Sequence, residues 1–226
     1  MSQKTFLVLG ATGTLGSAVA THLESFGATV LRVGHLSSAA GMLQCDIANH
    51  RSVHNLAKRV QEIIGKDQKL DGAFFGVSRH RFAECQHALH CQMDALEQAP
   101  ALAEMFNAEV LGMQMFLQVF TSTVLGRGRF VLPYPMFCRR GFDDIAFWNA
   151  LDSADINIRP YIAVKDMQFH LARLWADQFQ LELYEVPTMF VSERPLTGVI
   201  PAGLPEHLVN SAQSVVHATR VALLED

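Results

Sequence analysis

Three evenly spaced glycines near the start of the chain restrict its fold more than any other feature. Gly10, Gly13 and Gly16 follow the short apolar run Thr5–Leu9 and overlap the start of an amphipathic stretch, Leu15–Phe26. Glycine permits a tight turn and allows a helix to pack closely against the strand before it. The pattern therefore predicts a strand, a glycine turn and a helix, which together begin a βαβ unit.

Short apolar runs alternate with amphipathic stretches along the rest of the chain, as is typical of a parallel sheet covered by helices. The spacing predicts further strands at 29–33, 42–44, 71–75, 129–132 and 182–186, and helices at 53–64, 99–123, 161–179 and 206–224. We therefore predict an α/β fold with a Rossmann-type doubly wound parallel sheet in a three-layer α/β/α arrangement. Residues 1–226 are expected to form a single domain with an extended substrate loop at about 133–160.

The composition argues against several functional classes. The 226 residues carry a net charge of −4, whereas nucleic acids and anionic membranes attract clusters of Lys and Arg. The start of the chain does not resemble a signal peptide, and no apolar stretch is long enough to span a bilayer. Four cysteines without a CxxC pair are expected to be reduced thiols. We therefore expect a cytoplasmic protein with no nucleic-acid or membrane partner.

The glycine turn also has the properties of a phosphate-binding site. The N-terminus of a helix presents unpaired N–H groups and the positive end of its dipole, and both favour phosphate. Between a strand and a helix, this glycine spacing indicates a turn that binds the pyrophosphate of a dinucleotide. The candidate residues are Gly10, Thr12, Gly13, Leu15 and Gly16. The alternative is a glycine-rich turn that serves packing alone.

The end of the second expected strand bears on the choice of dinucleotide. A carboxylate there would bind the ribose 2′-hydroxyl of NAD and repel the additional phosphate of NADP. The segment has no acid and contains the positive or hydrogen-bonding side chains of Arg32, His35, Ser37 and Ser38. This favours NADP, with NAD as the other possible cofactor, unless the segment is merely a polar loop.

Further motifs produce a resemblance to the short-chain dehydrogenase/reductase family over nearly the whole chain. The segment from Tyr161 to Lys165 matches the Tyr-x-x-x-Lys motif of that family, at the expected place after the fifth strand. Asp46 and Ile47 stand where the family has an acidic and an apolar residue beside the adenine. Other positions similar to cofactor-binding segments of the family are Gly76, Pro187 and Ser192. The chain is identified as a divergent member of the family.

The resemblance implies an NADP-dependent carbonyl reductase or alcohol dehydrogenase that acts on small to medium organic substrates. In the family, a tyrosine hydroxyl gives a proton to the carbonyl oxygen while hydride arrives from the nicotinamide. A free tyrosine has a pKa of about 10, and a lysine one helical turn away lowers that pKa and holds the ribose hydroxyls. Tyr161 is then the acid/base and Lys165 its partner. The family forms dimers and tetramers, so a homodimer or homotetramer is expected.

Two positions depart from the family. Where the family has a serine that steadies the carbonyl oxygen, this chain has Tyr134, which could donate the same hydrogen bond. Alternatively the role is vacant, or Ser153 supplies the donor. The family's asparagine stands three residues before a glycine, a position that Glu109 occupies relative to Gly112. Asn107 does not replace it, because residues two apart on a helix point to opposite sides.

These departures leave a second interpretation open. A family member without the serine and the asparagine could bind NADP(H) as a sensor or scaffold, or catalyse a non-redox step such as cyclisation or dehydration. The segment after Tyr134 is also about twice as long as is usual in the family and carries Phe137, Phe142, Phe147 and Trp148. These aromatic residues fit a lining for an apolar substrate or a contact between subunits.

Histidine and cysteine residues gather after the fourth expected strand. They are His80, Cys85, His87, His90 and Cys91. A structural zinc site requires four ligands in a closed geometry, and this spacing matches no standard pattern. We therefore expect no metal site.

Overall fold

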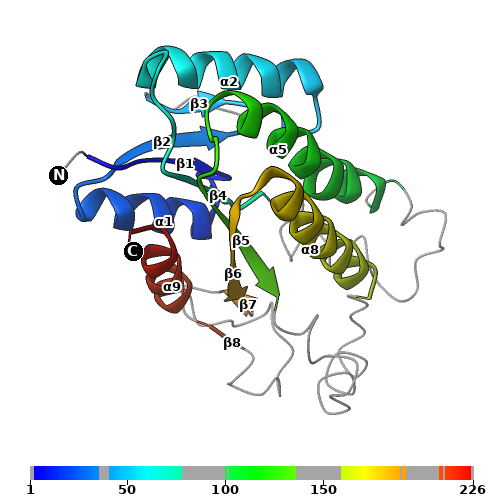
Figure 1. Ribbon diagram of the computed structural model, residues 1–226. Coiled ribbons are helices and arrows are strands. Elements are labelled where there is room, and N and C mark those ends of the chain that lie inside the picture. Colours follow the sequence, from blue (N-terminus) through cyan, green and yellow to red (C-terminus); the bar gives the residue numbers. More distant parts are fainter. Residues whose placement is uncertain are drawn as a thin grey trace.

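The computed structural model describes residues 3–35, 41–77, 100, 102–135, 159–188, 190–191, 209–210 and 212–224. At residues 135, 159–161, 187–188, 190–191, 209–210 and 212 it describes the backbone alone. Six strands form one parallel sheet in the order β3-β2-β1-β4-β5-β6 (Figure 1). The strands are β1 Thr5–Leu9, β2 Thr29–Gly34, β3 Leu43–Gln44, β4 Gly72–Phe75, β5 Arg129–Pro135 and β6 Glu182–Thr188. This strand order is that of the Rossmann fold, so the predicted fold class is confirmed.

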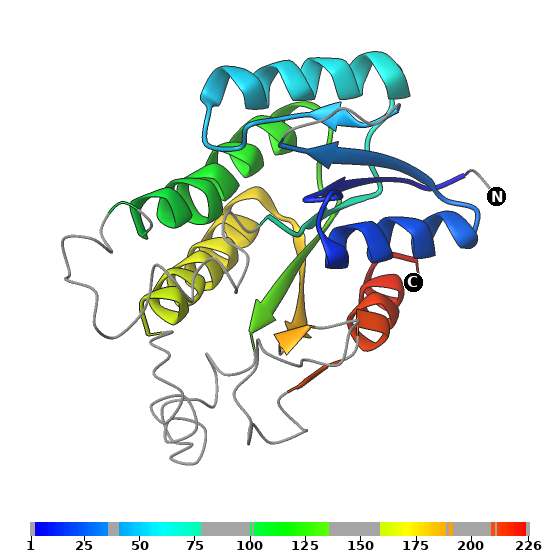
Figure 2. The ribbon, with the colours of Figure 1, turned by 180° about the vertical axis from the view of Figure 1, so that it is seen from behind.

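Helices cover both faces of the sheet, which gives the expected three layers (Figures 1 and 2). One face packs against α1 (Thr14–Ser25) and α9 (Ala212–Leu224). The other face packs against α2 (His50–Ile64), the π-helical segment η1 (Phe106–Leu111), α5 (Gly112–Thr123) and α8 (Arg159–Phe179). Among the described residues, no helix combines the length and apolar character that crossing a membrane requires.

The alternation of side chains along β1 explains how one strand serves both layers. Phe6 and Val8 are buried in the core shared with α1 and α9, whereas Leu7 and Leu9 are buried in the opposite core. Successive side chains of a strand point to opposite faces, so a strand covered on both sides is apolar throughout. The continuous apolar run that the sequence shows at β1 is thus the consequence of two helical layers.

The ends of the segment predicted as a loop, about 133–160, belong to regular elements. Residues 133–135 continue β5, and the helix α8 begins at Arg159. Pro133 and Pro135 suit this part of β5 because pairing with β4 ends at Val131, while pairing with β6 continues to Pro135. Proline is tolerated in a strand where no neighbour needs its missing N–H group. The aromatic residues predicted for the loop lie outside the described residues.

The C-terminal part differs from the predicted helix over residues 206–224. The helix α9 begins at Ala212, and Val209–Asn210 form a short strand, β8. That strand pairs in parallel with β7, Phe190–Val191. A two-residue strand carries too little periodicity to be separated from a helix by sequence pattern, so the pairing is decided by tertiary contact.

Cys45, which follows β3, is the cysteine that falls within the described residues. It is a free cysteine and is buried. Burial raises the pKa of its thiol to about 11, because desolvation disfavours the thiolate. The other three cysteines lie outside the described residues.

Candidate functional site

The glycine turn is held by close contacts between backbone segments. Gly10 has a φ of +76°, a conformation that glycine adopts without steric cost. A Cβ atom on Gly10 would lie 2.3 Å from the carbonyl oxygen of Gly76, and one on Gly16 would lie 2.3 Å from the carbonyl oxygen of Gly10. Gly10, Gly16 and Gly76, all predicted site residues, are therefore brought together where β1 and β4 end.

Gly13 lies on a more open side of the same turn. It is the N-cap residue of α1 with extended backbone angles, and a Cβ atom there would meet a single neighbour, the Gly10 carbonyl oxygen, at 3.4 Å. The N–H groups of Thr14, Leu15 and Gly16 begin the helix and have no intrahelical acceptor. The first turn of α1, which the structure describes in full, carries no acidic side chain. The positive end of the helix dipole is thus available, and the turn fits a pyrophosphate.

The end of β2 lies beside this turn. Thr12 packs against Gly34, since a Cβ atom on that glycine would approach the Thr12 Cγ2 atom to 2.7 Å. His35 Nδ1 lies 3.7 Å from Asp46 Oδ1, and both side chains are nearly half exposed. Thr12 thus lies against the last residue of β2, and His35, the residue that follows, lies beside Asp46. Ser37 and Ser38 lie outside the described residues.

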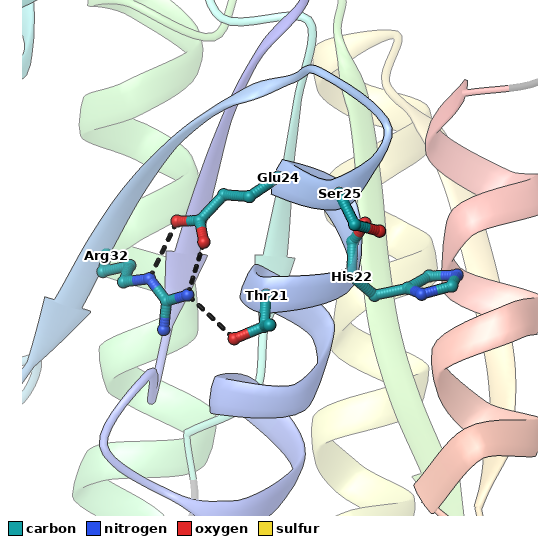
Figure 3. Close-up of polar contacts among 5 residues, drawn as sticks. All are labelled: Thr21, His22, Glu24, Ser25 and Arg32. Carbon is teal, nitrogen blue, oxygen red and sulfur yellow. Dashed lines mark hydrogen bonds and ion pairs between the residues drawn. The ribbon is translucent and has the colours of Figure 1, made fainter.

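Arg32 contributes less to this region than its position in the sequence suggests. Its guanidinium donates two hydrogen bonds to the carboxylate of Glu24, at 2.9 and 2.7 Å, and one to Thr21 Oγ1 at 3.0 Å (Figure 3). The hydrogen bond from Arg32 holds the pKa of Glu24 below its usual value. The charge of Arg32 is therefore paired with helix α1, and the expectation that Arg32 favours NADP stays a prediction.

Helix α8 carries the Tyr-x-x-x-Lys motif. The backbone of Tyr161 and Lys165 is helical, so the two residues share one helix face. The side chain of Lys165 is only 9% exposed, and that of Tyr161 lies outside the described residues. The backbone of Pro187 belongs to β6, opposite Tyr134 of β5, while Ser192 lies outside the described part of the chain.

A buried ion pair joins α8 to the π-helical segment. Lys165 Nζ contacts Glu109 Oε2, and the Glu109 side chain is fully buried. Gln168 connects the two residues: its Nε2 donates to the backbone carbonyl of Glu109 at 2.8 Å, and its Oε1 accepts from Lys165 Nζ at 3.2 Å. The sequence identified Glu109 by its distance from Gly112, but it gave no signal for Gln168 beyond the spacing of three from Lys165.

The segment that carries Glu109 is not the regular helix that the sequence predicts. The N–H group of Gly112 donates to the carbonyl of Asn107, five residues earlier, within η1. The side chain of Asn107 is exposed whereas Glu109 is buried, which confirms that the two point to opposite sides. A Cβ atom on Gly112 would lie 2.9 Å from the Ile47 carbonyl oxygen. Such π turns are rare and frequently lie at functional sites.

Tyr134 of β5 packs against helix α8. It is 4% exposed, and its ring stacks on Phe169 of α8 with centroids 3.9 Å apart. Phe169 is eight residues beyond Tyr161, or about 12 Å along a helix. The guanidinium of Arg173 lies 4.4 Å from the Phe169 ring centroid on the next turn. This packing favours a structural role for the Tyr134 ring, and its predicted hydrogen bond to a carbonyl stays a prediction.

The histidine and cysteine cluster predicted from sequence lies outside the described residues, as does Ser153. Within the described part of the chain, no group of three or more His, Cys, Asp or Glu side chains is arranged to hold a metal ion. A shallow hollow of about 330 Å³ lies between β3 and α2 and is lined by residues that include Gln44, Asp46 and Arg59. Of the predicted site residues, only Asp46 is among the residues that line this hollow.

A family model and several solved structures are similar to the chain. The model of the NAD dependent epimerase/dehydratase family matches residues 6–65, which hold the glycine turn and the end of β2. No curated protein sequence matches the chain. The solved structures include the protein lin1944 of Listeria innocua, which is 17% identical with a TM-score of 0.69; the match covers 98% of this chain and 94% of that one.

Two further structures extend this comparison. Aldohexose dehydrogenase of Thermoplasma acidophilum, in ligand-free form, is 13% identical with a TM-score of 0.70, over 98% of this chain and 87% of that one. A short chain dehydrogenase of Burkholderia cenocepacia, in complex with NADP, is 17% identical with a TM-score of 0.68, over 97% and 90%. At these identities the likeness shows the fold, and the fold is that of short-chain dehydrogenases.

Proposed function

We propose that this chain is an NADP(H)-dependent oxidoreductase of the short-chain dehydrogenase/reductase type, a carbonyl reductase or alcohol dehydrogenase for small to medium organic substrates. The observation that carries the proposal is the glycine turn, where backbone contacts hold an open helix N-terminus beside the ends of β1 and β4. The match of residues 6–65 to a family of NAD-dependent enzymes supports it. The similarity in fold to dehydrogenases supports it as well.

The chain's own residues would divide the work as follows. The amides of Thr14 to Gly16 bind the pyrophosphate, while Asp46, Ile47 and Gly76 border the adenosine half. When bound, the nicotinamide supplies or accepts hydride. Tyr161 gives the proton to the carbonyl oxygen of the substrate, and Lys165 orients the ribose and lowers the pKa of the tyrosine hydroxyl. Tyr134, Pro187 and Ser192 keep the roles that the resemblance implies.

The choice between NADP and NAD rests on few groups. Because Arg32 is paired with Glu24, His35 and the two serines at positions 37 and 38 are the remaining candidates for contact with a 2′-phosphate. His35 lies beside Asp46, with Nδ1 3.7 Å from Oδ1, and an imidazole N–H group can donate a hydrogen bond to a phosphate oxygen. NADP is the proposed cofactor, and a preference for NAD in a binding titration would contradict this part.

A second function is favoured by two observations. Glu109 contacts Lys165 and Tyr134 stacks on Phe169, so the positions where the family has an asparagine and a serine hold different groups. A protein of this kind could bind NADP(H) as a sensor or scaffold, or catalyse cyclisation or dehydration. Product formed with no change in cofactor redox state would favour the non-redox enzyme over the reductase.

Isothermal titration with NADPH, NADP⁺, NADH and NAD⁺, followed by a carbonyl substrate panel read at 340 nm, tests the proposal. We expect binding of NADP(H) and substrate-dependent oxidation of NADPH that Tyr161→Phe abolishes while binding is retained. Turnover that survives Tyr161→Phe would contradict the assigned role. Tight binding without turnover would favour the sensor, and no binding of any dinucleotide would reject both functions.

We further propose a homodimer or homotetramer in the cytoplasm, with a small-molecule substrate as partner. The oligomer is carried over from the resemblance, and the compartment is inferred from four cysteines without a CxxC pair. Light scattering after size exclusion checks the first point. A mass of one chain, 25.0 kDa, would reject the oligomer.

A further inference from the structure

The contact between Glu109 and Lys165 gives the candidate site a charge balance that its motifs do not indicate. The Tyr-x-x-x-Lys motif on its own places a positive charge one helical turn from Tyr161. In this chain, a carboxylate on a different helical segment touches that lysine, and its side chain is fully buried. A buried charge is costly unless it is paired and hydrogen-bonded, so the carboxylate and the ammonium depend on each other.

The surroundings of the pair offer few other charges. Apolar side chains of Met105, Val110 and Val164 pack together between η1 and α8. On α8, Asp166 and His170 lie together on the exposed side, with Oδ1 and Nδ1 3.5 Å apart. Helix α5, from Gly112 to Thr123, contains no titratable side chain, as its sequence shows. Glu104 is exposed. Lys165 is thus a cation in direct contact with Glu109.

Gln168 fixes the geometry of the pair. It is 1% exposed and uses both ends of its amide, one on Lys165 Nζ and one on the backbone of Glu109. The π turn at 106–111 is the backbone feature that presents Glu109 to α8 while Asn107 stays in solvent. The arrangement is therefore built by two segments of the chain and not by the rotation of one exposed side chain.

We propose that Glu109 is a positioning residue that holds the ammonium of Lys165 and cancels its charge beside the nicotinamide site. The inference rests on the proposed function. Two consequences follow from the sign of the charge. The effect of Lys165 on the pKa of Tyr161 is weakened, and the positive charge of an oxidised nicotinamide meets less repulsion than it would beside an unpaired lysine.

The matched variants are Glu109→Gln, which keeps the shape and removes the charge, and Glu104→Gln, which makes the same change on an exposed side chain five residues earlier. Isothermal titration gives the ratio of dissociation constants for NADP⁺ and NADPH. We expect Glu109→Gln to raise this ratio by about tenfold, and Glu104→Gln to change it less than about twofold, as expected for an exposed and screened charge. An unchanged ratio in Glu109→Gln overturns the proposal.

The pH profile of turnover gives a second readout that a merely structural residue would not move. In Glu109→Gln the uncompensated lysine lowers the pKa of the acid/base group, so the half-maximal pH shifts to lower pH by roughly one unit. A shift to higher pH, or none, contradicts the assigned charge effect. The same profile for Glu104→Gln should coincide with that of the unaltered protein.

A double-mutant cycle measured by thermal unfolding tests this inference separately from the proposed function, and it also applies if the variants fold poorly. Glu109→Gln and Lys165→Met should each lower the melting temperature, and the double variant should lose less than the sum of the two losses. Additive losses show that the pair does not form and overturn the proposal. If the unaltered protein binds no dinucleotide, the proposed function fails and the role at a nicotinamide site falls with it, whereas non-additive losses would still establish the pair.

Discussion

The glycine turn and the Glu109–Lys165 pair belong to one fold but are held in opposite ways. The turn is held by contacts between backbone atoms, and a Cβ atom at Gly10 or Gly16 would overlap the carbonyl oxygen of Gly76 or of Gly10. The pair is formed by side chains of distant segments, and the loss of either charge would leave the other buried without its partner in this contact. A substitution in the glycine turn therefore destabilises the fold by steric overlap. A substitution in the buried ion pair destabilises it by leaving an uncompensated charge.

The largest expected effect lies at the pair. Lys165→Met should lower the free energy of unfolding by about 3–5 kcal/mol, because it leaves Glu109 buried without its cation. Chemical denaturation at neutral pH measures the loss. The control is Arg32→Met, which removes a partly exposed ion pair with Glu24 and should cost about 1 kcal/mol or less. Similar losses for the two variants would show that burial does not distinguish the pairs.

The turn should respond to an added methyl group. Gly10→Ala should lower the free energy of unfolding by roughly 3 kcal/mol, since the new Cβ atom would lie 2.3 Å from the Gly76 carbonyl. Gly27→Ala is the matched control, because Gly27 also has a positive φ, +82°, but has no atom within 4 Å of the added group. That variant should cost about 1 kcal/mol. Equal losses of stability in the two variants would show that the positive φ, and not the contact with Gly76, causes the effect.

A charge at Gly13 should affect binding and leave the fold intact. Gly13→Asp places a carboxylate at the N-cap of α1, where the backbone angles suit any residue and aspartate is a favourable cap. We expect the dissociation constant for NADPH to rise by about 100-fold, because the carboxylate repels the pyrophosphate, while the melting temperature does not fall. Gly13→Ser serves as the neutral capping control. Equal affinities of the two variants would contradict a phosphate site at this turn.

The smallest effect is expected in acid, at the exposed pair that Figure 3 shows. The pKa of Glu24 is lowered from its ordinary value of 4.5 in the folded protein, so its stabilising contribution is present above that pH and is lost as the pH falls below it. Because the side chain is 41% exposed, the loss should stay below about 1 kcal/mol. Glu24→Gln should remove this part of the pH dependence of unfolding, and an unaltered acid limb would show that the pair contributes nothing.

The ends of the elements show where sequence patterns lose their predictive value. Strand β1 and the face of α2 were predictable because their apolar residues follow the periods of a strand and a helix. The continuation of β5 through Pro133 and Pro135 was not, because proline predicts an interruption unless the pairing of each edge is known. The π turn at 106–111 was equally hidden, since its residues continue a helical pattern and its geometry depends on contact with Ile47 and α8.

In the candidate site, too, some features follow from the sequence and others only from the structure. The sequence indicated that Glu109 occupies an unusual position, and the structure placed it in contact with Lys165 and Gln168. It also offered Tyr134 as a hydrogen-bond donor, and the structure adds that the Tyr134 ring stacks on Phe169, which leaves that role a prediction. Residue type and spacing reveal which groups are available, but they do not reveal which of them face each other.

By itself, the sequence determined the doubly wound α/β fold and the glycine turn, because both depend on periodicity and on residues close together in the chain. Only the tertiary structure decided that Arg32 pairs with Glu24 and that Glu109 is buried against Lys165. The physical reason is that the state of a charged side chain depends on its burial and its partner, and neither follows from residue type and spacing alone.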